Sequence, residues 1–238
     1  SCHRLKIPLD VSRVEKDLSA VLTFAKQHEI HNAVVKIIVT RGVGGRGYAW
    51  EKNAGKCTMY PTLVIGLYPP PQHSADCSDE GILATICQQR LSLSTSLSGL
   101  KHLNKLEHVL ARNEEWKSEC KEGILCDERG FIVEATSSNI FLVIGGELLT
   151  PELSMCGVEG IMRKIIMDQL VSKIGINCRA TRISRPMLDQ ADEVFLTNSV
   201  NGIWPVKKID DVVYGKGRVT TLLQDSLTEY LQQLGHDE

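Results

Sequence analysis

The chain has 238 residues, of which 42% are hydrophobic and 24% are charged, and its formal net charge is −2. These values are typical of a globular protein with one large domain or two small ones. Without an excess of basic residues, nucleic acid is not expected as the main partner, and no apolar run is long enough to span a membrane. The eight cysteines are scattered, which predicts reduced thiols in a cytoplasmic protein. His28 and His31 lie close in sequence, but nothing nearby completes a metal site.

The first third of the chain predicts a small mixed lobe. Asp10 or Ser12 can cap a helix whose apolar residues repeat at helical spacing. Two apolar, β-branched runs at residues 33–40 and 61–68 predict strands, and a further strand is expected around residues 82–86. The chain begins in mid-pattern without Met, so we expect that an N-terminal segment is missing from it.

The rest of the chain predicts short strands and several helices. One helix is expected over residues 157–174, with Ile161, Ile165, Leu170 and Ile174 turned inward. The other expected elements are strands at residues 123–127, 131–135, 140–144, 148–151, 176–183 and 193–197, and helices at residues 186–191 and 220–234. Strands and helices in both halves indicate an α+β fold with two lobes.

A glycine-rich loop follows the first predicted strand. Residues 42–47, Gly-Val-Gly-Gly-Arg-Gly, match the dinucleotide-binding pattern, but that site needs a helix next and an acidic residue after the second strand, and both are missing. A plain glycine turn remains open. We favour a loop that directs Arg46 and Tyr48 at an anion, with glycines that allow close backbone approach.

The stretch around Lys101 begins with small residues and continues as a predicted helix. Leu103, Leu106, Val109 and Leu110 have the spacing of one buried face, and Lys101 stands at the entrance. From spacing alone, a solvated surface lysine is the ordinary interpretation.

Two further segments can bind an anion. The free amide hydrogens of Ile161 and Met162, near the start of the helix at residues 157–174, form an anion site without a charged side chain. Asn198 and Ser199 end a buried strand and can complete it. An ordinary glycine-containing helix start is the alternative.

Several segments resemble one enzyme family. Residues 101–107, Lys-His-Leu-Asn-Lys-Leu-Glu, resemble the Schiff-base lysine motif of the aminodeoxychorismate lyase family, among the fold type IV, branched-chain aminotransferase-like pyridoxal phosphate enzymes. Blocks at residues 40–48, 134–141, 156–163 and 198–206 resemble the same family in the same order.

This resemblance implies pyridoxal phosphate as the cofactor. It implies that Lys101 binds the cofactor covalently and moves protons. It also implies that Glu134, otherwise an ordinary strand-end carboxylate, faces the pyridine nitrogen and keeps it protonated. The other implied contacts are Ile161, Met162 and Asn198 for the cofactor phosphate, and Arg46 and Tyr48 for a substrate carboxylate.

The implied architecture is the two-lobed α+β fold of D-amino acid and branched-chain aminotransferases. We expect a smaller lobe at residues 1–95, without its first segment, and a larger lobe at residues 96–238 that carries the lysine. The family's phosphate-binding arginine and an active-site threonine would precede Ser1. The family is dimeric, so a homodimer is implied.

The implied activity is conversion of the small molecule 4-amino-4-deoxychorismate to 4-aminobenzoate and pyruvate. Aminotransferases of this superfamily usually carry a tyrosine after the asparagine near the lysine. Here Lys105 follows Asn104, which favours the lyase. A fold type IV aminotransferase acting on D- or branched-chain amino acids remains an alternative, as does a non-catalytic relative that keeps the fold.

Overall fold

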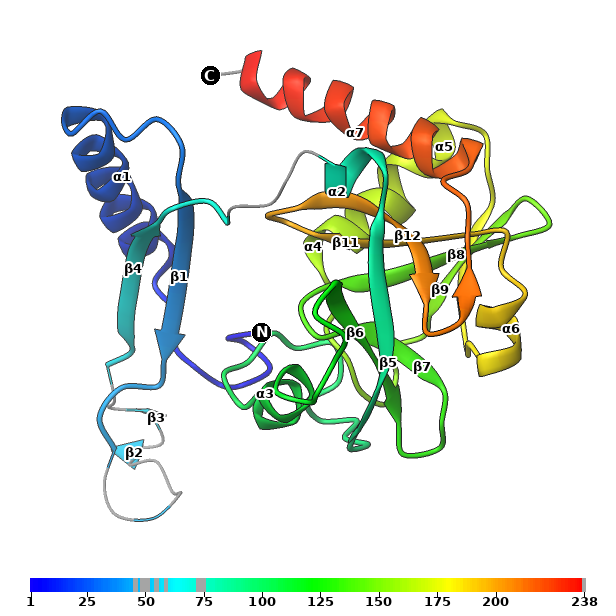
Figure 1. Ribbon diagram of the computed structural model, residues 1–238. Helices are drawn as coiled ribbons and strands as arrows, with labels where there is room; N and C mark the ends of the chain where they lie inside the picture. The colour runs from blue at the N-terminus through cyan, green and yellow to red at the C-terminus, as the bar shows by residue number, and fades with distance from the viewer. Residues whose placement is uncertain (45–46, 48–51, 54–55, 58–59, 72–75, 237–238) are drawn as a thin grey trace. The chain divides into compact units, whose positions relative to one another are not determined.

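The computed structural model of the chain describes residues 1–44, 47, 52–53, 56–57, 60–71 and 76–236. It divides into two compact units, Ser1–Gln72 and His73–Glu238. This division lies earlier in the chain than the expected boundary at residue 95. The physical reason is that β5 (Ile82–Leu91) pairs with strands of the larger unit and belongs to its sheet (Figure 1).

The smaller unit contains the helix and both strands expected from the sequence. Helix α1 (Val11–Gln27) begins after Asp10, whose side chain accepts a hydrogen bond from the backbone N–H of Arg13, so this cap is confirmed. Strands β1 (Val34–Thr40) and β4 (Thr62–Tyr68) pair antiparallel. The short strands β2 (Lys52–Asn53) and β3 (Lys56–Cys57) form a second antiparallel pair.

A nine-stranded mixed sheet organises the larger unit. Its order is β10-β9-β8-β11-β12-β5-β6-β7, with β13 paired to β12. Strand β5 runs parallel to both β12 and β6, and β10 runs parallel to β9, whereas the other neighbours are antiparallel. The strands besides β5 are β6 (Cys120–Asp127), β7 (Ile132–Ala135), β8 (Asn139–Ile144), β9 (Glu147–Pro151), β10 (Cys178–Thr181), β11 (Glu193–Asn198), β12 (Gly202–Ile209) and β13 (Val212–Val213).

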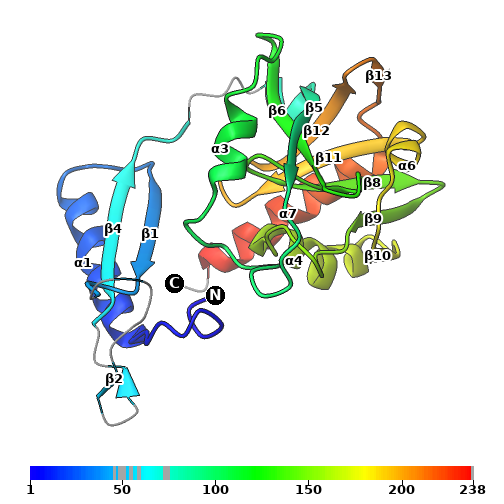
Figure 2. The same cartoon turned by 90° about the horizontal axis from the view of Figure 1, so that it is seen from below.

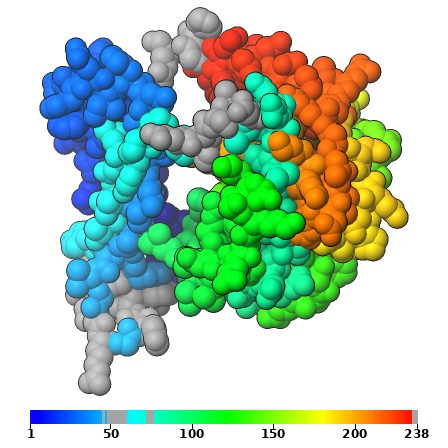
Figure 3. All heavy atoms as spheres, in the orientation of Figure 1, coloured from blue at the N-terminus to red at the C-terminus, as the bar shows by residue number. Residues whose placement is uncertain are grey.

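Helices cover one face of this sheet. The α7 helix packs with the helical run formed by α4, the π-helical turn η1 and α5 (Figures 1 and 2). In the space-filling view, α7 forms a ridge along the edge of the larger unit (Figure 3). The helical elements of this unit are α2 (Asp76–Asp79), α3 (Leu106–Arg112), α4 (Ile161–Ile165), η1 (Ile166–Leu170), α5 (Val171–Lys173), α6 (Arg185–Asp189) and α7 (Arg218–His236).

The core of the larger unit lies on both faces of the sheet. Strand β8 shows this most simply, because successive side chains of a strand point to opposite faces. Phe141 and Val143 pack under α4, η1 and α7, whereas Ile140 and Leu142 join the cluster on the other face. Strands buried on both faces read as continuous apolar runs, which explains why β8 could be predicted from its composition.

The predicted buried face of the lysine stretch is wrong. Leu103, Leu106, Val109 and Leu110 are between 51% and 67% exposed, and the helix α3 begins only at Leu106. The short helix instead turns Ala111 and the ring of His108 inward, toward β5 and β6.

The long helix predicted over residues 157–174 is shorter and interrupted. It begins at Ile161 because Gly160 is extended, with φ −69° and ψ 146°, and its middle is the π-helical turn η1. Ile161 is 71% exposed rather than turned inward, whereas Leu170 is buried as expected. In α7, Leu223 and Leu227 are buried, whereas Leu231 and Leu234 are exposed.

The remaining predicted strands and the helix near residue 186 are present with shifted ends. Within the described part of the chain, none of the helices combines the length and the apolar character that crossing a bilayer requires.

Candidate active site

Residues 98–112, here called the lysine stretch, are held against residues 157–160. The latter residues lead into α4 and are called the connecting segment. The backbone N–H of Gly99 donates to the carbonyl of Gly157 at 2.9 Å, and the N–H of Glu159 donates to the carbonyl of Gly99 at 3.1 Å. Gly157 has φ +88°, and a Cβ there would lie 2.7 and 2.8 Å from two neighbouring side chains, so this position requires glycine. The backbone of Lys101 therefore lies two residues from a fixed pairing.

Glu134 reaches the same segment from β7. Its side chain is only 4% exposed, and its Oε2 accepts a hydrogen bond from the backbone N–H of Val158 at 2.8 Å. Its Oε1 lies 2.9 Å from Nε2 of His108. Both oxygens of the carboxylate are thus held, and hydrogen bonds of this kind stabilise a buried negative charge. The position is buried, unlike an ordinary strand-end glutamate.

The start of α4 is built around Gly160. A Cβ at Gly160 would lie 2.1 Å from Oδ1 of Asn139, and Nδ2 of Asn139 donates to the carbonyl of Val158 at 2.8 Å. Ile161 and Met162 follow directly as the first residues of the helix. The backbone amides that the sequence proposes for a phosphate therefore lie next to the segment that pairs with Gly99 and Glu134.

The side chain of Asn198 forms hydrogen bonds within its own turn and with Ser138. Its Oδ1 accepts from the backbone N–H groups of Val200 at 2.9 Å and Asn201 at 2.8 Å, and its Nδ2 donates to Oγ of Ser138 at 3.0 Å. These contacts place it one residue away from Asn139, at the edge of the region described above. Ser199 beside it is exposed.

The structure thus brings together the lysine stretch, Glu134 and the start of α4, with Asn198 and Ser199 at the margin. The side chain of Lys101 is exposed, and it stands before α3 rather than on it. Arg46 and Tyr48 lie outside the described residues, so their contact with a substrate stays a prediction.

A cavity of about 330 Å³ lies beside this region, within the larger unit. Its wall includes Lys105, His102 and His108 from the lysine stretch, and Gly157 from the connecting segment. Burial lowers the pKa of Lys105, with the positive charge of Lys101 adding to the effect. Burial also lowers the pKa of His102, helped by the neighbouring Lys105. This volume is within the range of small-molecule sites.

The sequence interpretation did not single out His108, Lys105 or His102 as site residues. His108 and Lys105 follow Lys101 by seven and four residues, so both belong to the same stretch. The signal was present as polar residues between the leucines. The leucine spacing instead predicts an apolar buried face and gives no role to the polar residues between the leucines.

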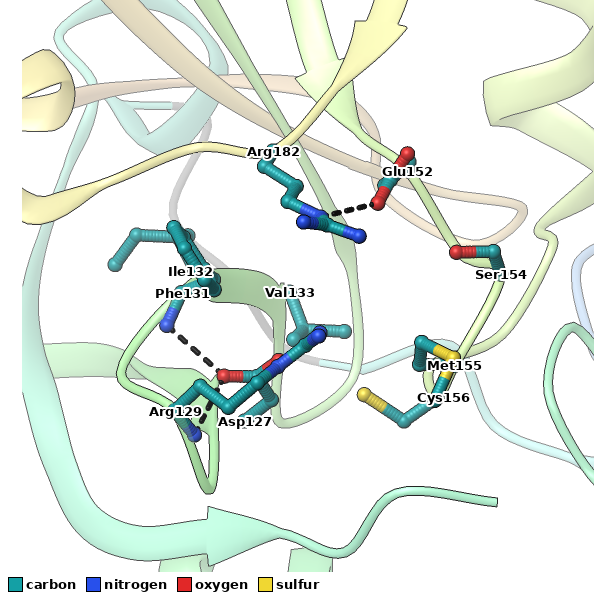
Figure 4. A pocket seen from close by; sticks show the side chains of 10 residues that line it. All are labelled: Asp127, Arg129, Phe131, Ile132, Val133, Glu152, Ser154, Met155, Cys156 and Arg182. Atoms are coloured by element: carbon teal, nitrogen blue, oxygen red, sulfur yellow. Dashed lines mark hydrogen bonds and ion pairs between the residues drawn. The ribbon is translucent and has the colours of Figure 1, made fainter. Parts of the chain in front are cut away.

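A second, much smaller cavity, of about 10 Å³, lies near the turn after β6 (Figure 4). Its charged residues already neutralise one another: Arg129 Nη2 lies 2.7 Å from Asp127, and Arg182 Nε lies 2.7 Å from Glu152. Cys156 lines both cavities, and burial raises the pKa of its thiol to about 11, which makes it unreactive near neutral pH. This second cavity is structural.

Known proteins share this architecture. The chain is 30% identical to the aminodeoxychorismate lyase of Vibrio harveyi over 227 residues, which covers 94% of this chain and 80% of the relative. The crystal structure of 4-amino-4-deoxychorismate lyase from Pseudomonas aeruginosa superposes with a TM-score of 0.87 and 38% identity, over 96% of this chain and 80% of that one. A branched-chain amino acid aminotransferase from Escherichia coli superposes with a TM-score of 0.77 and 26% identity, over 95% and 73%.

The family model for class IV aminotransferases matches residues 1–209. A fold type IV architecture, expected from the sequence, is therefore confirmed by the structural neighbours. This chain belongs to the class IV aminotransferase family.

Proposed function

We propose that this chain is a pyridoxal phosphate-dependent lyase that converts 4-amino-4-deoxychorismate to 4-aminobenzoate and pyruvate, a reaction of folate biosynthesis. The support from relatives is the similarity to the two aminodeoxychorismate lyases. The observation that carries the proposal is the convergence of the lysine stretch, Glu134 and the start of α4 on the connecting segment.

Enzymes of this family use pyridoxal phosphate, and the residues of the larger unit fit that group. When bound, the cofactor supplies an electron sink for a carbanion next to nitrogen. Glu134 fits the contact with the pyridine nitrogen, because it is a buried carboxylate whose two oxygens are fixed by His108 and Val158. A fixed negative charge at this point keeps the ring nitrogen protonated.

Lys101 is the residue that we assign to covalent attachment and proton transfer. Its backbone is fixed through Gly99, while its side chain is exposed and able to reach a ligand. With the cofactor bound, the amino group of Lys101 would act as the base that takes the proton from the substrate carbon that bears the nitrogen. Loss of the enolpyruvyl group as pyruvate and aromatisation of the ring complete the reaction.

The phosphate and substrate contacts complete the proposed site. The backbone amides of Ile161 and Met162 hold the phosphate at the start of α4, and Asn198 and Ser199 stand at its margin. Arg46 and Tyr48 bind a substrate carboxylate, because the planar guanidinium forms two parallel hydrogen bonds with a carboxylate.

The test is incubation of protein loaded with pyridoxal phosphate with 4-amino-4-deoxychorismate. Equimolar pyruvate and 4-aminobenzoate are expected, and Lys101→Ala should form neither product. Borohydride treatment followed by peptide mapping should place the pyridoxyl group on Lys101. Label on Lys36, Lys105 or Lys164 instead would contradict the assignment of the lysine.

An aminotransferase acting on D- or branched-chain amino acids is the second candidate, favoured by the similarity to the Escherichia coli branched-chain enzyme. An aminotransferase would convert the cofactor to its amine form with an amino acid alone, which a lyase does poorly. A large absorbance change with branched-chain or D-amino acids, without 4-aminobenzoate formation from the chorismate substrate, would favour this candidate.

We also propose a homodimer in the cytoplasm. The exposed apolar residues of the lysine stretch, Leu103, Leu106, Val109 and Leu110, support an interface, because contiguous exposed apolar patches commonly mark association sites. The seven cysteines other than Cys57 are free, which suits a reducing compartment. Light scattering at micromolar concentration tests the dimer, and a monomeric mass would contradict it.

A further inference from the structure

The larger cavity has a polar wall that includes the charged side chains of Lys105 and Glu107. Lys105 is half-buried in it, and among the described residues its ammonium group has no hydrogen-bond or ion-pair partner. A charged group shielded from water without a partner is unfavourable, because it loses hydration and gains nothing in return. Such a group is a place where a ligand of opposite charge stabilises the protein.

The acidic groups near Lys105 are already engaged. Glu107 Oε1 accepts hydrogen bonds from the backbone N–H of Ser92 at 3.0 Å and from its hydroxyl at 2.5 Å. Glu134 is held by His108 and by the backbone N–H of Val158. Neither carboxylate therefore forms an ion pair with Lys105, although both attract its ammonium group from farther away.

Two imidazole nitrogens in the same wall lack partners. Nδ1 of His102 and Nδ1 of His108 are buried and form no hydrogen bond within the described part of the chain. His108 uses Nε2 as the donor to Glu134, so its neutral form offers only a lone pair at Nδ1. A ring nitrogen of His102 forms a hydrogen bond with the backbone of Asn104, so the unpartnered Nδ1 can donate to a ligand when the ring carries its second proton.

We propose that Lys105 and His102 form a subsite that binds the ring carboxylate of the substrate. This inference rests on the proposed lyase function and deepens it. The substrate carries one carboxylate on the ring and another on the enolpyruvyl arm. Lys105 supplies the charge and His102 a directed hydrogen bond for the ring carboxylate, and the cavity of about 330 Å³ has room for a six-membered ring.

The test measures binding of 4-aminobenzoate and of its uncharged analogue 4-aminobenzamide to the protein loaded with pyridoxal phosphate, by calorimetry. The wild-type protein should bind the acid at least about tenfold more tightly than the amide. Lys105→Met should weaken binding of the acid at least about tenfold and leave that of the amide within about threefold. Lys105→Arg should retain most of the affinity for the acid. His102→Leu should weaken it less than Lys105→Met does.

The exposed Lys117, just after α3, provides the matched control, and Lys117→Met should change neither affinity. Steady-state kinetics of pyruvate release give a second readout, in which Lys105→Met should raise KM more than it lowers kcat. Failure of the wild-type protein to bind 4-aminobenzoate, or equal affinities in Lys105→Met and wild type, overturns the subsite even if pyruvate is released. Lys105-dependent binding without pyruvate release instead overturns the lyase function and leaves the carboxylate subsite standing.

Discussion

His108 and Glu134 form a hydrogen-bonded pair of side chains next to the connecting segment. The distance from Nε2 to Oε1 is 2.9 Å, and the two side chains are 14% and 4% exposed. If Glu134 holds the pyridine nitrogen, His108 acts through it, by fixing the carboxylate. Replacement of His108 with leucine should therefore lower kcat about 10- to 100-fold, as expected for one lost hydrogen bond to a charged group.

The matched variants separate this effect from simple loss of stability. His108→Gln keeps an N–H donor and should restore kcat to within about threefold of the wild type. Asn113→Ala removes a hydrogen bond to the carbonyl of Val109 at the end of the same helix and should leave kcat nearly unchanged. Steady-state kinetics of cofactor-loaded protein decide the matter. Equal kcat values for His108→Leu and His108→Gln would remove the hydrogen bond from the mechanism.

Cys87 makes the folded state sensitive to alkaline pH. Its side chain is buried beside Gly123, and burial raises the pKa of its thiol from 9.0 to about 12, with Glu114 adding to the effect. The unfolded chain releases this proton above pH 9.0 while the folded chain keeps it. This contribution to stability is therefore complete below pH 9.0 and is lost as the pH rises toward 12, by about 1.4 kcal/mol per pH unit.

The Cys87→Ala variant isolates this contribution. Urea unfolding midpoints measured between pH 8 and pH 11 should fall more steeply for the wild type than for Cys87→Ala. Alanine does not titrate, so the difference between the two slopes belongs to the thiol. Parallel slopes would show that the thiol does not keep its proton in the folded chain.

At the scale of elements, Glu193 links the sheet to α7. It lies at the start of β11 and accepts hydrogen bonds from the backbone N–H groups of Val219 at 3.0 Å and Thr220 at 2.8 Å, and from the Thr220 hydroxyl at 2.6 Å. Glu193→Ala leaves these buried donors without a partner and should lower the free energy of unfolding by about 2–4 kcal/mol.

Two further variants serve as a control and as a second test of the contact between Glu193 and α7. Glu229→Ala, on the exposed side of the same helix, should change the free energy of unfolding by less than about 0.5 kcal/mol. Gly217→Ala should be destabilising, because its Cβ would lie 2.1 Å from Oε1 of Glu193. Chemical denaturation measures all three. A change in Glu193→Ala no larger than that in Glu229→Ala would contradict the capping role.

The individual helices and strands also show which parts of the fold could be predicted from the sequence. Strands such as β8 and β11 were predictable because burial on both faces leaves a continuous apolar run. The inward face of α3 could not be predicted. Three leucines and one valine outnumber Ala111, and local spacing does not tell which side of the helix meets the sheet. Glu134 was placed by its motif, but its partner His108 depends on contacts between α3 and β7 that no local pattern encodes.

At the scale of the whole molecule, the two units differ in how many apolar side chains are buried. This burial protects backbone amides from exchange with solvent. In the larger unit, β8 and β11 are central strands with nearly every side chain buried. Among the described residues of Ser1–Gln72, Ala25 is the apolar side chain that is fully buried, and β1 and β4 form a sheet of two strands with Ile37 and Val64 exposed. Small apolar cores and two-stranded sheets contribute little stability.

Hydrogen exchange should therefore separate the units in the intact chain. Amides of β1 and β4 open by local fluctuations, so they should exchange at least about 100-fold faster than those of β8 and β11, which require opening of the central sheet. Exchange of the full-length protein, followed by mass spectrometry of its peptides, measures this ratio. The amides of α7 provide an internal reference, because Leu223 and Leu227 bind that helix to the larger core and should make its first half slow. Equal protection of β4 and β8 would mean that the smaller unit draws its stability from contacts beyond its own core.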